Sequence, residues 1–269
     1  MRAAPAVFML LGLGCEICAA EFVVPATMGG FVSQTPHSFS YVPSFPVPKL
    51  GYLHETFAML PTECEVLVQV MASSVNPCDR STDAARNPKV IGSDIAGTVV
   101  AVGSGCTRLK VGDEVWADIG AVVHLRTNNA STKELGAYAE YAVALETQLG
   151  LKPKNLGWVE AGSLPKVALT SYKALVWYGG GAPWIAGKVV LVLGGSGGTG
   201  TAGIQIAKAL GAAKVITTAA TGSEAYCKQL GADVWYDYHT HNWWDPAVVA
   251  ADSVDVVYDC VGQRGSGDR

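Results

Sequence analysis

The sequence predicts an α/β protein of two lobes, a β-barrel-like lobe followed by a doubly wound parallel sheet. Between residues 65 and 144, short apolar runs are punctuated by Gly, Pro and Asp, which is the pattern of half-buried strands. From residue 188 onward, strand-like runs alternate with helical ones, which indicates a parallel sheet with right-handed crossovers. A glycine-rich turn from Gly194 to Gly200 follows the first apolar run of this second block.

Composition narrows the classes of protein to consider. Of the 269 residues, 49% are hydrophobic and 16% are charged, which excludes a disordered chain and a coiled coil. The net charge is -4 and Lys and Arg do not cluster, so neither nucleic acid nor an anionic membrane is expected as the main partner. A chain of this length holds one large or two medium domains.

The first 48 residues are expected to precede the folded domains. Residues 1–20 resemble a secretory signal peptide, because Arg2 precedes an apolar run and small residues end the segment. The alternative is a stray apolar N-terminus, and the run is too short to span a bilayer. Residues 21–48 lack strand or helix periodicity and are predicted to be a linker or a transit-like extension. The expected destination is the secretory route or an organelle, and otherwise the cytoplasm.

The cysteine pattern predicts no disulfide framework. Seven cysteines are present, and the five that remain beyond the leader are an odd and scattered set. Cys15 and Cys18 form a C-x-x-C motif inside the apolar leader, where chance explains it best. His239 and His241 form an H-x-H motif beside two tryptophans, which favours a surface loop over a metal site.

The two lobes are predicted over residues 49–153 and 154–269. The first lobe is expected to hold strands at 66–70, 97–103, 111–116 and 137–144, with a polar surface loop at 127–134. The second lobe is expected to begin with a helical segment at 159–177 that Pro165 interrupts. It should continue with strands at 188–193, 214–218, 233–236 and 254–258, and with helices at 201–210 and 223–230.

The turn after the first strand of the second lobe predicts a dinucleotide site. Gly195, Gly197 and Gly200 fit the G-x-G-x-x-G pattern in the required strand–turn–helix context. These glycines permit the tight turn, the approach of backbone to a pyrophosphate, and close packing of helix on strand. N–H groups at the start of the helix then face the anion. The other residues of this predicted site are Ser196, Gly198 and Thr199.

The segment after the second strand favours NADPH over NADH. NAD-type sites place Asp or Glu there to accept the ribose 2′-hydroxyl, but this segment has no acid before Glu224. Its hydroxyl groups would tolerate a 2′-phosphate, although no Arg or Lys stands ready to pair with one. The predicted contacts are Thr218, Thr221 and Ser223.

Several motifs in order resemble one family. Residues 92–117 (GSDIAGTVVAVGSGCTRLKVGDEVWA), 138–141 (YAEY), 164–175 and the glycine turn are similar to the medium-chain dehydrogenase/reductase superfamily. The similarity is to its zinc-independent quinone oxidoreductase and enoyl-reductase branch, and it covers residues 50–262. It implies a GroES-like catalytic domain followed by a Rossmann domain, with NADPH and substrate between them.

The resemblance also implies that no zinc is bound. Zinc-bearing relatives have a Cys where Asn76 stands, and a His-Glu pair where Ser93 and Asp94 follow Gly92. The four closely spaced cysteines of a structural zinc site are missing from this sequence. No residue is therefore expected to ligate a metal.

The resemblance assigns roles to several residues. Asn76 would line the nicotinamide and substrate cleft, or simply cap the turn before Pro77. Thr170 would contact the nicotinamide end, or only bond within its own helix. Tyr238 matches a tyrosine that some NADPH-dependent relatives place near the 2′-phosphate, and Ser223 stands where those relatives have a basic residue.

The resemblance further implies a loop beneath the cofactor ribose, formed by Asp259, Cys260, Val261 and Gly262. In this loop Cys260 is expected to be a small buried hydrophobe and not a nucleophile.

Two features depart from the family pattern. Relatives carry a Tyr soon after the Val-Asn-Pro segment as a proton donor, whereas residues 80–86 contain none. The dinucleotide domain is expected to be incomplete, because the sequence ends after the fourth strand and two more should follow. The fourth strand would then be an unprotected edge of the sheet. Three explanations are left open: an incomplete gene model, a truncated isoform, or a chain that completes its sheet with a partner.

The expected function is hydride transfer from NADPH, and less readily from NADH, to an activated C=C bond or a quinone-type small molecule. The alternative is a non-catalytic nucleotide-binding or truncated protein that keeps the fold without turnover. An enoyl-reductase module cut from a larger synthase is disfavoured by the leader. The expected partner is a small-molecule substrate, and a homodimer is left open.

Overall fold

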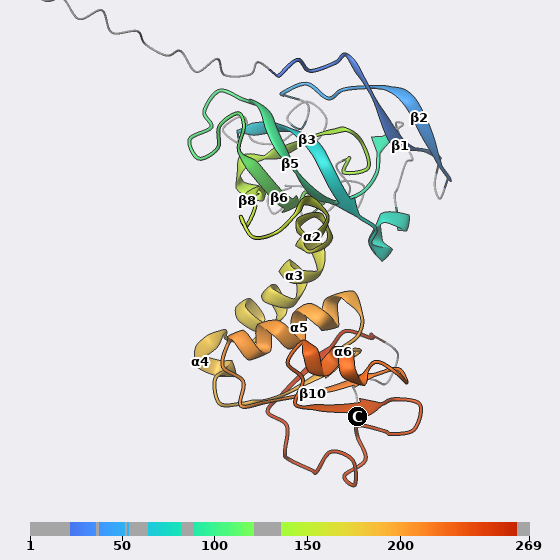
Figure 1. Ribbon diagram of the computed structural model, residues 1–269, viewed down its shortest axis with the longest axis vertical. Coiled ribbons are helices and arrows are strands. Elements are labelled where there is room, and N and C mark those ends of the chain that lie inside the picture. Colours follow the sequence, from blue (N-terminus) through green and yellow to red (C-terminus); the bar gives the residue numbers. More distant parts are fainter. Residues whose placement is uncertain are drawn as a thin grey trace, which may run out of the picture.

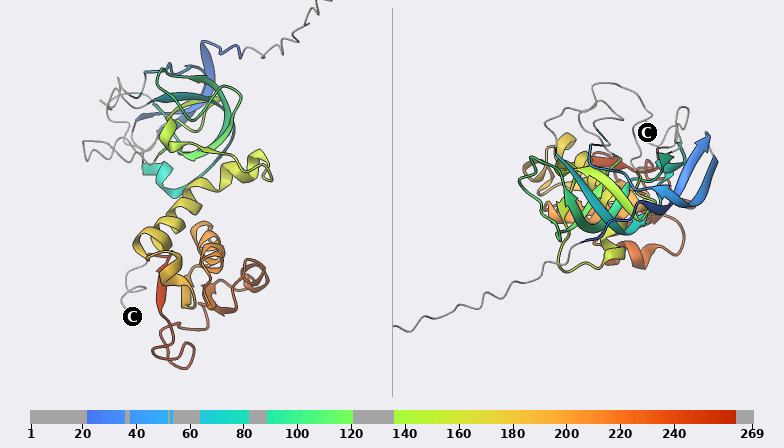
Figure 2. Two further views of the ribbon diagram at one scale, coloured as in Figure 1. Left: turned by 90° about the vertical axis from the view of Figure 1, so that its left-hand side faces the viewer. Right: turned by 90° about the horizontal axis from the view of Figure 1, so that it is seen from above.

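The chain folds into two lobes that are stacked along the long axis of the molecule (Figure 1, Figure 2). The structure is a computed structural model that describes residues 22–35, 38–51, 53, 64–81, 89–120 and 136–262. Helices α2 (Trp158–Ser163) and α3 (Pro165–Tyr172) run between the lobes. The predicted α/β architecture, strands first and a helix-flanked parallel sheet second, is confirmed.

The upper lobe is built on a five-stranded antiparallel sheet in the order β7-β3-β5-β6-β8. Its strands are β3 (Glu65–Ser74), β5 (Asp94–Val102), β6 (Glu114–Asp118), β7 (Tyr141–Leu145) and β8 (Gly150–Leu151). Val66, Ile95, Val99 and Val115 are fully buried and form the centre of its core. In β5, a Cβ at Gly97 would collide with the backbone of β3, so the strands approach closely only because this residue is glycine.

Residues 21–48 are not a linker, contrary to the prediction. Strands β1 (Thr27–Thr35) and β2 (Ser38–Pro46) form an antiparallel hairpin, and β1 also pairs with β4 (Lys89–Val90). Met28 and Val32 are buried in the core. The periodicity was hidden because β2 is an edge strand with both faces largely exposed, where prolines are tolerated. The predicted leader at 1–20 and surface loop at 127–134 lie outside the described residues.

The lower lobe is built on a parallel sheet in the order β11-β10-β9-β12. The order places the fourth strand beside the first, as in the 3-2-1-4-5-6 order of a doubly wound dinucleotide domain. The strands are β9 (Val189–Leu193), β10 (Lys214–Ala219), β11 (Val234–Asp237) and β12 (Val256–Asp259), and the helices are α4 (Ala182–Ile185), α5 (Gly198–Ala209) and α6 (Glu224–Gln229). Strand β9 is buried on both faces, because Val190 and Val192 pack with Ile204 while Leu191 and Leu193 pack on the opposite side.

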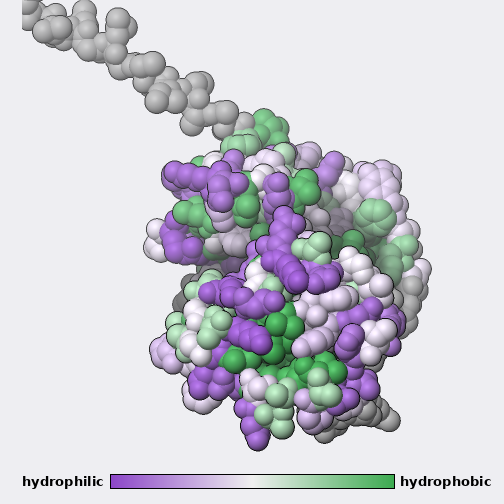
Figure 3. Space-filling view, turned by 60° about the horizontal axis from the view of Figure 1, so that its bottom comes forward, coloured by the Kyte–Doolittle hydropathy of each residue, from purple (hydrophilic) through white to green (hydrophobic). Residues whose placement is uncertain are grey.

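Strand β12 lies at one edge of the described sheet. Hydrophobic side chains gather on the face of this lobe that Figure 3 brings forward. The large hydrophobic residues that this lobe exposes include Trp177, Tyr178, Trp184, Val257 and Val261. Among the described residues, every helix is too short or too polar to cross a membrane.

The helical segment between the lobes is interrupted where Pro165 was expected to interrupt it. Helix α2 ends at Ser163, and Pro165 then occupies the first turn of α3, where its missing N–H has no cost. Helix α2 packs on β3 and β5, with Gly162 against Ala72. Helix α3 packs on both β6 and α5, and continues as a π-helical turn, η4 (Lys173–Tyr178). It therefore contacts both lobes.

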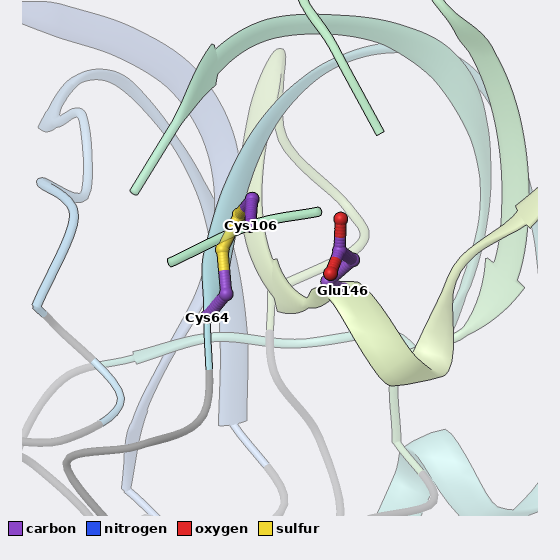
Figure 4. A group of neighbouring side chains, drawn as sticks. All are labelled: Cys64, Cys106 and Glu146. Atoms are coloured by element: carbon purple, nitrogen blue, oxygen red, sulfur yellow. A yellow bond between two sulfur atoms is a disulfide. The ribbon is translucent and has the colours of Figure 1, made fainter. Parts of the chain in front are cut away.

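A disulfide joins Cys64 to Cys106, which the scattered cysteine pattern did not reveal (Figure 4). The two Cα atoms are 5.2 Å apart, inside the usual range for a disulfide. Cys64 precedes β3 and Cys106 follows β5, and these strands pair through Val66 and Val102. The pair is thus brought together by strand register, which spacing along the chain does not show.

Glu146, in the 3-10 turn η3 (Glu146–Gln148), lies beside this disulfide (Figure 4). Its carboxylate accepts backbone N–H groups from Thr107, Arg108 and Leu109 at 3.3, 2.7 and 2.7 Å. Burial alone would raise the pKa of this carboxyl, but the three hydrogen bonds and the charge of Arg108 together have a larger, opposite effect. Its net pKa therefore lies below the usual value. With the sulfurs bonded to each other and the carboxylate already satisfied, this group of side chains is structural and offers no thiolate to a metal.

Candidate active site

The glycine turn lies between the end of β9 and the start of α5. A Cβ on Gly200 would collide with the backbone of Gly194, and one on Gly195 would collide with the side chain of Thr217. The first N–H groups of the 12-residue helix α5 have no acceptor within the helix, and Gly197 gives its N-terminus no side-chain cap. A helix N-terminus of this kind attracts anions, and the binding of a pyrophosphate by Gly195 to Gly200, including Ser196, Gly198 and Thr199, stays a prediction.

Thr218, one of the predicted cofactor contacts, holds the glycine turn in place. Its carbonyl accepts the N–H of Gly194 at 3.0 Å and that of Gly195 at 2.9 Å, and its hydroxyl lies 3.3 Å from the N–H of Gly194. Thr218 is buried. Its contribution in this structure is therefore to shape the turn, and a direct contact with the cofactor stays a prediction.

The residues predicted for the 2′-phosphate side gather where β10 and β11 end. The hydroxyl of Thr221 donates to the carboxylate of Asp237, which also accepts the N–H of His239 at 2.9 Å. The hydrogen bond from Thr221 is the main reason that the pKa of Asp237 lies below its usual value. Tyr238 is exposed, with its ring centroid 4.3 Å from that of His239, while Ser223 lies at the start of α6.

Asp237 is an acidic residue at this edge of the sheet that its place in the sequence does not indicate. A ribose-binding acid is expected at the end of β10, whereas Asp237 comes from the end of the neighbouring strand β11. The parallel register of these strands pairs Ala219 with Asp237, so the two ends meet.

The predicted ribose loop, residues 259–262, lies against the glycine turn. The Asp259 carboxylate accepts the N–H groups of Val261 at 2.8 Å and Gly262 at 3.1 Å, which bends the chain after β12. A methyl group of Val261 would be 3.0 Å from a Cβ on Gly194. Cys260 is half-buried against the core and not fully buried as expected, and burial raises the pKa of its thiol to about 11, which favours the protonated form.

Asn76 lies in a buried polar cluster at the end of β3. Its side-chain amide donates to Asp94 at 2.8 Å, and Asp94 also accepts the hydroxyl of Ser74 at 2.7 Å. The Asn76 backbone N–H donates to the Asp79 carboxylate at 2.8 Å, and the Asp79 N–H donates to the Asn76 carbonyl at 3.0 Å. The two expected roles of Asn76 are therefore compatible, because its backbone closes the turn while its side chain reaches the cluster.

Asp79 joins the segment 138–141 to this cluster. The hydroxyl of Tyr138 contacts the Asp79 carboxylate and lies 3.1 Å from the carbonyl oxygen of Ser74. Ser93 donates its hydroxyl hydrogen to Asp79 at 3.1 Å. The ring of Tyr138 covers Gly92, whose φ of +93° and lack of a side chain allow this close approach.

Lys166 carries the positive charge of the cluster and was not singled out from the sequence. Its backbone N–H donates to Asp94 at 2.9 Å, and its Nζ lies 2.9 Å from a carboxylate oxygen of Asp118. Burial alone would lower the pKa of Lys166, but the nearby acidic groups, with Asp118 first among them, together have a larger, opposite effect. The net pKa lies above its usual value, so the ammonium form is favoured. A lysine directly after Pro165, at the start of a largely apolar helix, is the signal that could have found it.

Helix α3 connects this cluster to the cofactor turn. Thr170, the second predicted catalytic residue, is exposed one turn after Lys166 on the same side of the helix. Ser171 donates its hydroxyl hydrogen toward the carbonyl of Thr199 at 2.8 Å, and Val167 packs on Gly198. Helix α3 thus contacts the carboxylate that holds Asn76 near its start and the first residues of α5 near its end, and the catalytic roles of Asn76 and Thr170 stay predictions.

An apolar groove of about 720 Å³ lies beside the cluster in the upper lobe. The β1–β2 hairpin, the end of β3 and residues 137–140 form its walls. It shares Ser74 and Tyr138 with the polar cluster, but the cofactor turn does not line it.

Two family models match the chain. The alcohol dehydrogenase GroES-like domain matches residues 62–154, and the zinc-binding dehydrogenase model matches residues 198–266. The first match falls on the upper lobe and the second on the parallel sheet with its helices.

Curated relatives and a solved structure are similar to the chain. The 2-methylene-furan-3-one reductase of Solanum lycopersicum is 42% identical over 210 residues, covering 75% of this chain and 50% of that protein. The NADPH-dependent alkenal/one oxidoreductase, chloroplastic, of Arabidopsis thaliana is 39% identical over 209 residues, covering 74% and 50%. The structure of the quinone oxidoreductase from Coxiella burnetii aligns with a TM-score of 0.68 at 29% identity, covering 88% and 69%. The chain spans about half the length of these curated relatives.

Proposed function

Because this chain belongs to the medium-chain dehydrogenase/reductase superfamily, we propose that it reduces an activated C=C bond or a quinone with NADPH. The observation that carries the proposal is α3, which contacts the glycine turn through Ser171 and the Asn76 cluster through Lys166. The names of the tomato and Arabidopsis relatives support an enone or an alkenal as the substrate class.

The side chains divide the work between the lobes. The glycine turn and the N-terminus of α5 would hold the pyrophosphate, and the 259–262 loop would support the ribose. NADPH, when bound, supplies the hydride. Thr170 would contact the nicotinamide end. Asn76, whose amide is oriented by Asp94, would fix the substrate so that the reacting carbon lies at near-attack distance.

We further propose that the reaction proceeds without zinc. The positions that match zinc ligands hold an amide, a hydroxyl and a carboxylate, and both oxygens of that Asp94 carboxylate already accept hydrogen bonds. The ammonium of Lys166 beside them repels a divalent cation, and the nitrogen and sulfur ligands that zinc prefers do not occupy these positions. Elemental analysis of the purified protein and turnover after chelation test this, with no stoichiometric zinc and unchanged turnover as the expected result.

The preference for NADPH over NADH is supported by Tyr238, which matches a tyrosine that some NADPH-dependent relatives place near the 2′-phosphate, and by the name of the Arabidopsis relative. Asp237 opposes it, because the hydrogen bonds from Thr221 and the N–H of His239 lower the pKa of this carboxyl and keep it negatively charged. Fluorescence titration of the purified chain with each cofactor tests the preference. A lower Kd for NADH than for NADPH would contradict it.

Turnover is the direct test of the proposed function. The purified chain is mixed with NADPH and either a small enone or a quinone, and NADPH oxidation is followed by absorbance. Saturable turnover of either substrate supports the proposal. Cofactor binding without turnover of either would favour a non-catalytic nucleotide-binding protein, the alternative that the internally satisfied hydrogen bonds of Asn76 support.

The proposal also covers the location of the protein in the cell and its assembly. The chloroplastic and mitochondrial relatives support an organelle as the destination of residues 1–20, which a fluorescent fusion of that segment tests. The exposed hydrophobic side chains of the lower lobe support a homodimer, which sedimentation velocity tests.

A further inference from the structure

We propose that Lys166 is a catalytic residue of this reduction, whose ammonium group donates a hydrogen bond to the substrate carbonyl oxygen as negative charge develops there. The inference rests on the proposed function. It assigns the group that polarises the substrate carbonyl, since the positions that match zinc ligands hold Asn76, Ser93 and Asp94, and the sequence of residues 80–86 has no Tyr.

Contacts of the backbone N–H and of the side-chain ammonium both fix the position of Lys166. Its backbone N–H is bound by Asp94, the same carboxylate that orients the Asn76 amide. Its Nζ is held 2.9 Å from Asp118, which lies directly opposite Asp94 in the register of β5 and β6. The backbone of Lys166 is therefore fixed at the carboxylate that also holds Asn76, its ammonium is fixed at Asp118, and Thr170 follows one helical turn later.

The ammonium is also able to bind a further group. A lysine carries three N–H donors, and the ion pair with Asp118 uses one of them. The Lys166 side chain is 22% exposed, whereas the Asp118 side chain is 7% exposed. The ammonium group of Lys166 is thus held by the buried Asp118 carboxylate and is also partly exposed to solvent. A group that binds a substrate oxyanion needs such an accessible N–H donor.

The chemistry needs such a donor. When hydride from NADPH adds to the β-carbon of an enone, the C=C electron pair shifts toward the carbonyl oxygen and an enolate forms. A preorganised donor at this oxygen lowers the barrier, and removing one such donor costs about 10²–10³ in kcat in other enzymes. A proton from water then adds to the α-carbon, so the substrate gains one hydride and one proton in total.

A merely structural role for Lys166 makes a different prediction. Asp94 and Asp118 are both buried, so Lys166 could serve only to neutralise them. A Lys166→Met change alone would then leave Asp118 unpaired and could unfold the lobe. The double variant Lys166→Met/Asp118→Asn removes the pair together and avoids that charge. Lys166→Arg keeps the charge, and Lys188→Met removes a surface lysine paired with Asp255 at 3.2 Å as a matched control.

The first test measures anion binding and does not need turnover. A nitrophenol, whose anion mimics the enolate oxygen, is titrated into the NADP⁺-saturated wild type and variants, and its ionised fraction is read from absorbance. The wild type, Lys166→Arg and Lys188→Met should favour the bound anion. The double variant should bind it at least about tenfold more weakly. Equal anion binding by the double variant, or no preference for the anion in the wild type, would overturn the assignment.

The second test is kinetic. The double variant should lose about 10²–10³ in kcat/KM for the enone while its Kd for NADPH stays within about twofold of wild type. Unchanged kcat/KM in the folded double variant would refute a catalytic role. If the wild type itself turns over no enone or quinone, the proposed function fails, and nitrophenolate binding still decides whether Lys166 is an anion-binding group.

Discussion

Asp94 is the residue whose chemistry depends most on its surroundings. It is completely buried, and burial raises its pKa from 3.8 to about 6, although hydrogen bonds from Ser74 and Asn76 and the charge of Lys166 oppose the shift. Because the native carboxyl holds its proton more tightly than the unfolded one, the contribution of Asp94 to stability falls as the pH rises from about 4 to about 6. The cost of the ionised form is on the order of 3 kcal/mol above that range.

The titration of Asp94 can be observed directly. We expect carbon NMR of the Asp carboxyls, assigned with the variant Asp94→Asn, to show one group that titrates near pH 6. Lys166→Arg is the control, because it keeps the positive charge and should leave the midpoint of Asp94 near pH 6. The double variant Lys166→Met/Asp118→Asn is less useful here, because it removes both the Asp118 charge, which raises the pKa of Asp94, and the Lys166 charge, which lowers it. A midpoint near 4 in the wild type would contradict the burial argument.

At the scale of elements, the glycine turn and the start of α5 form a unit that sequence reasoning described well. The strand, turn and helix are adjacent in the chain, so their geometry depends on local residue types. The Gly200 position is occupied by glycine because a Cβ would meet the backbone of Gly194. Thr218, whose carbonyl accepts the N–H groups of Gly194 and Gly195, comes from β10 and was expected to contact the cofactor, not to hold this turn.

We expect Gly200→Ala to weaken NADPH binding by about tenfold or more, which corresponds to about 1.4 kcal/mol. The added methyl group would push the start of α5 away from the turn and move its N–H donors. Gln205→Ala, on the exposed side of the same helix, is the control and should bind as the wild type does. Fluorescence titration measures both, and equal Kd values would show that the turn tolerates a side chain.

The hairpin β1–β2 shows where element prediction failed. Its edge strand is exposed on both faces and carries prolines, so the alternation that marks a half-buried strand is missing. Tertiary contacts make the segment part of the fold, because Met28 and Val32 are buried in the core and β1 pairs with β4.

At the scale of the whole molecule, the disulfide constrains the upper lobe. Cys64 and Cys106 are 42 residues apart, and closing a loop of that length stabilises the fold by about 4 kcal/mol in the chain-entropy model. We expect Cys64→Ala/Cys106→Ala to lower the free energy of unfolding in urea by up to about that amount. The reduced wild type should match the double variant. If oxidised wild type and double variant unfold at the same urea concentration, the bond contributes no stability.

The sequence by itself determined the two-lobe architecture and the glycine turn. Each depends on patterns between neighbours in the chain, namely apolar periodicity and the spacing of glycines. Tertiary structure alone decided which distant groups meet: Asp94 opposite Asp118 with Lys166 between them, Asp237 beside Thr221, and Cys64 bonded to Cys106. These pairings depend on strand register and helix docking, where a shift of one residue would turn every side chain to the other face.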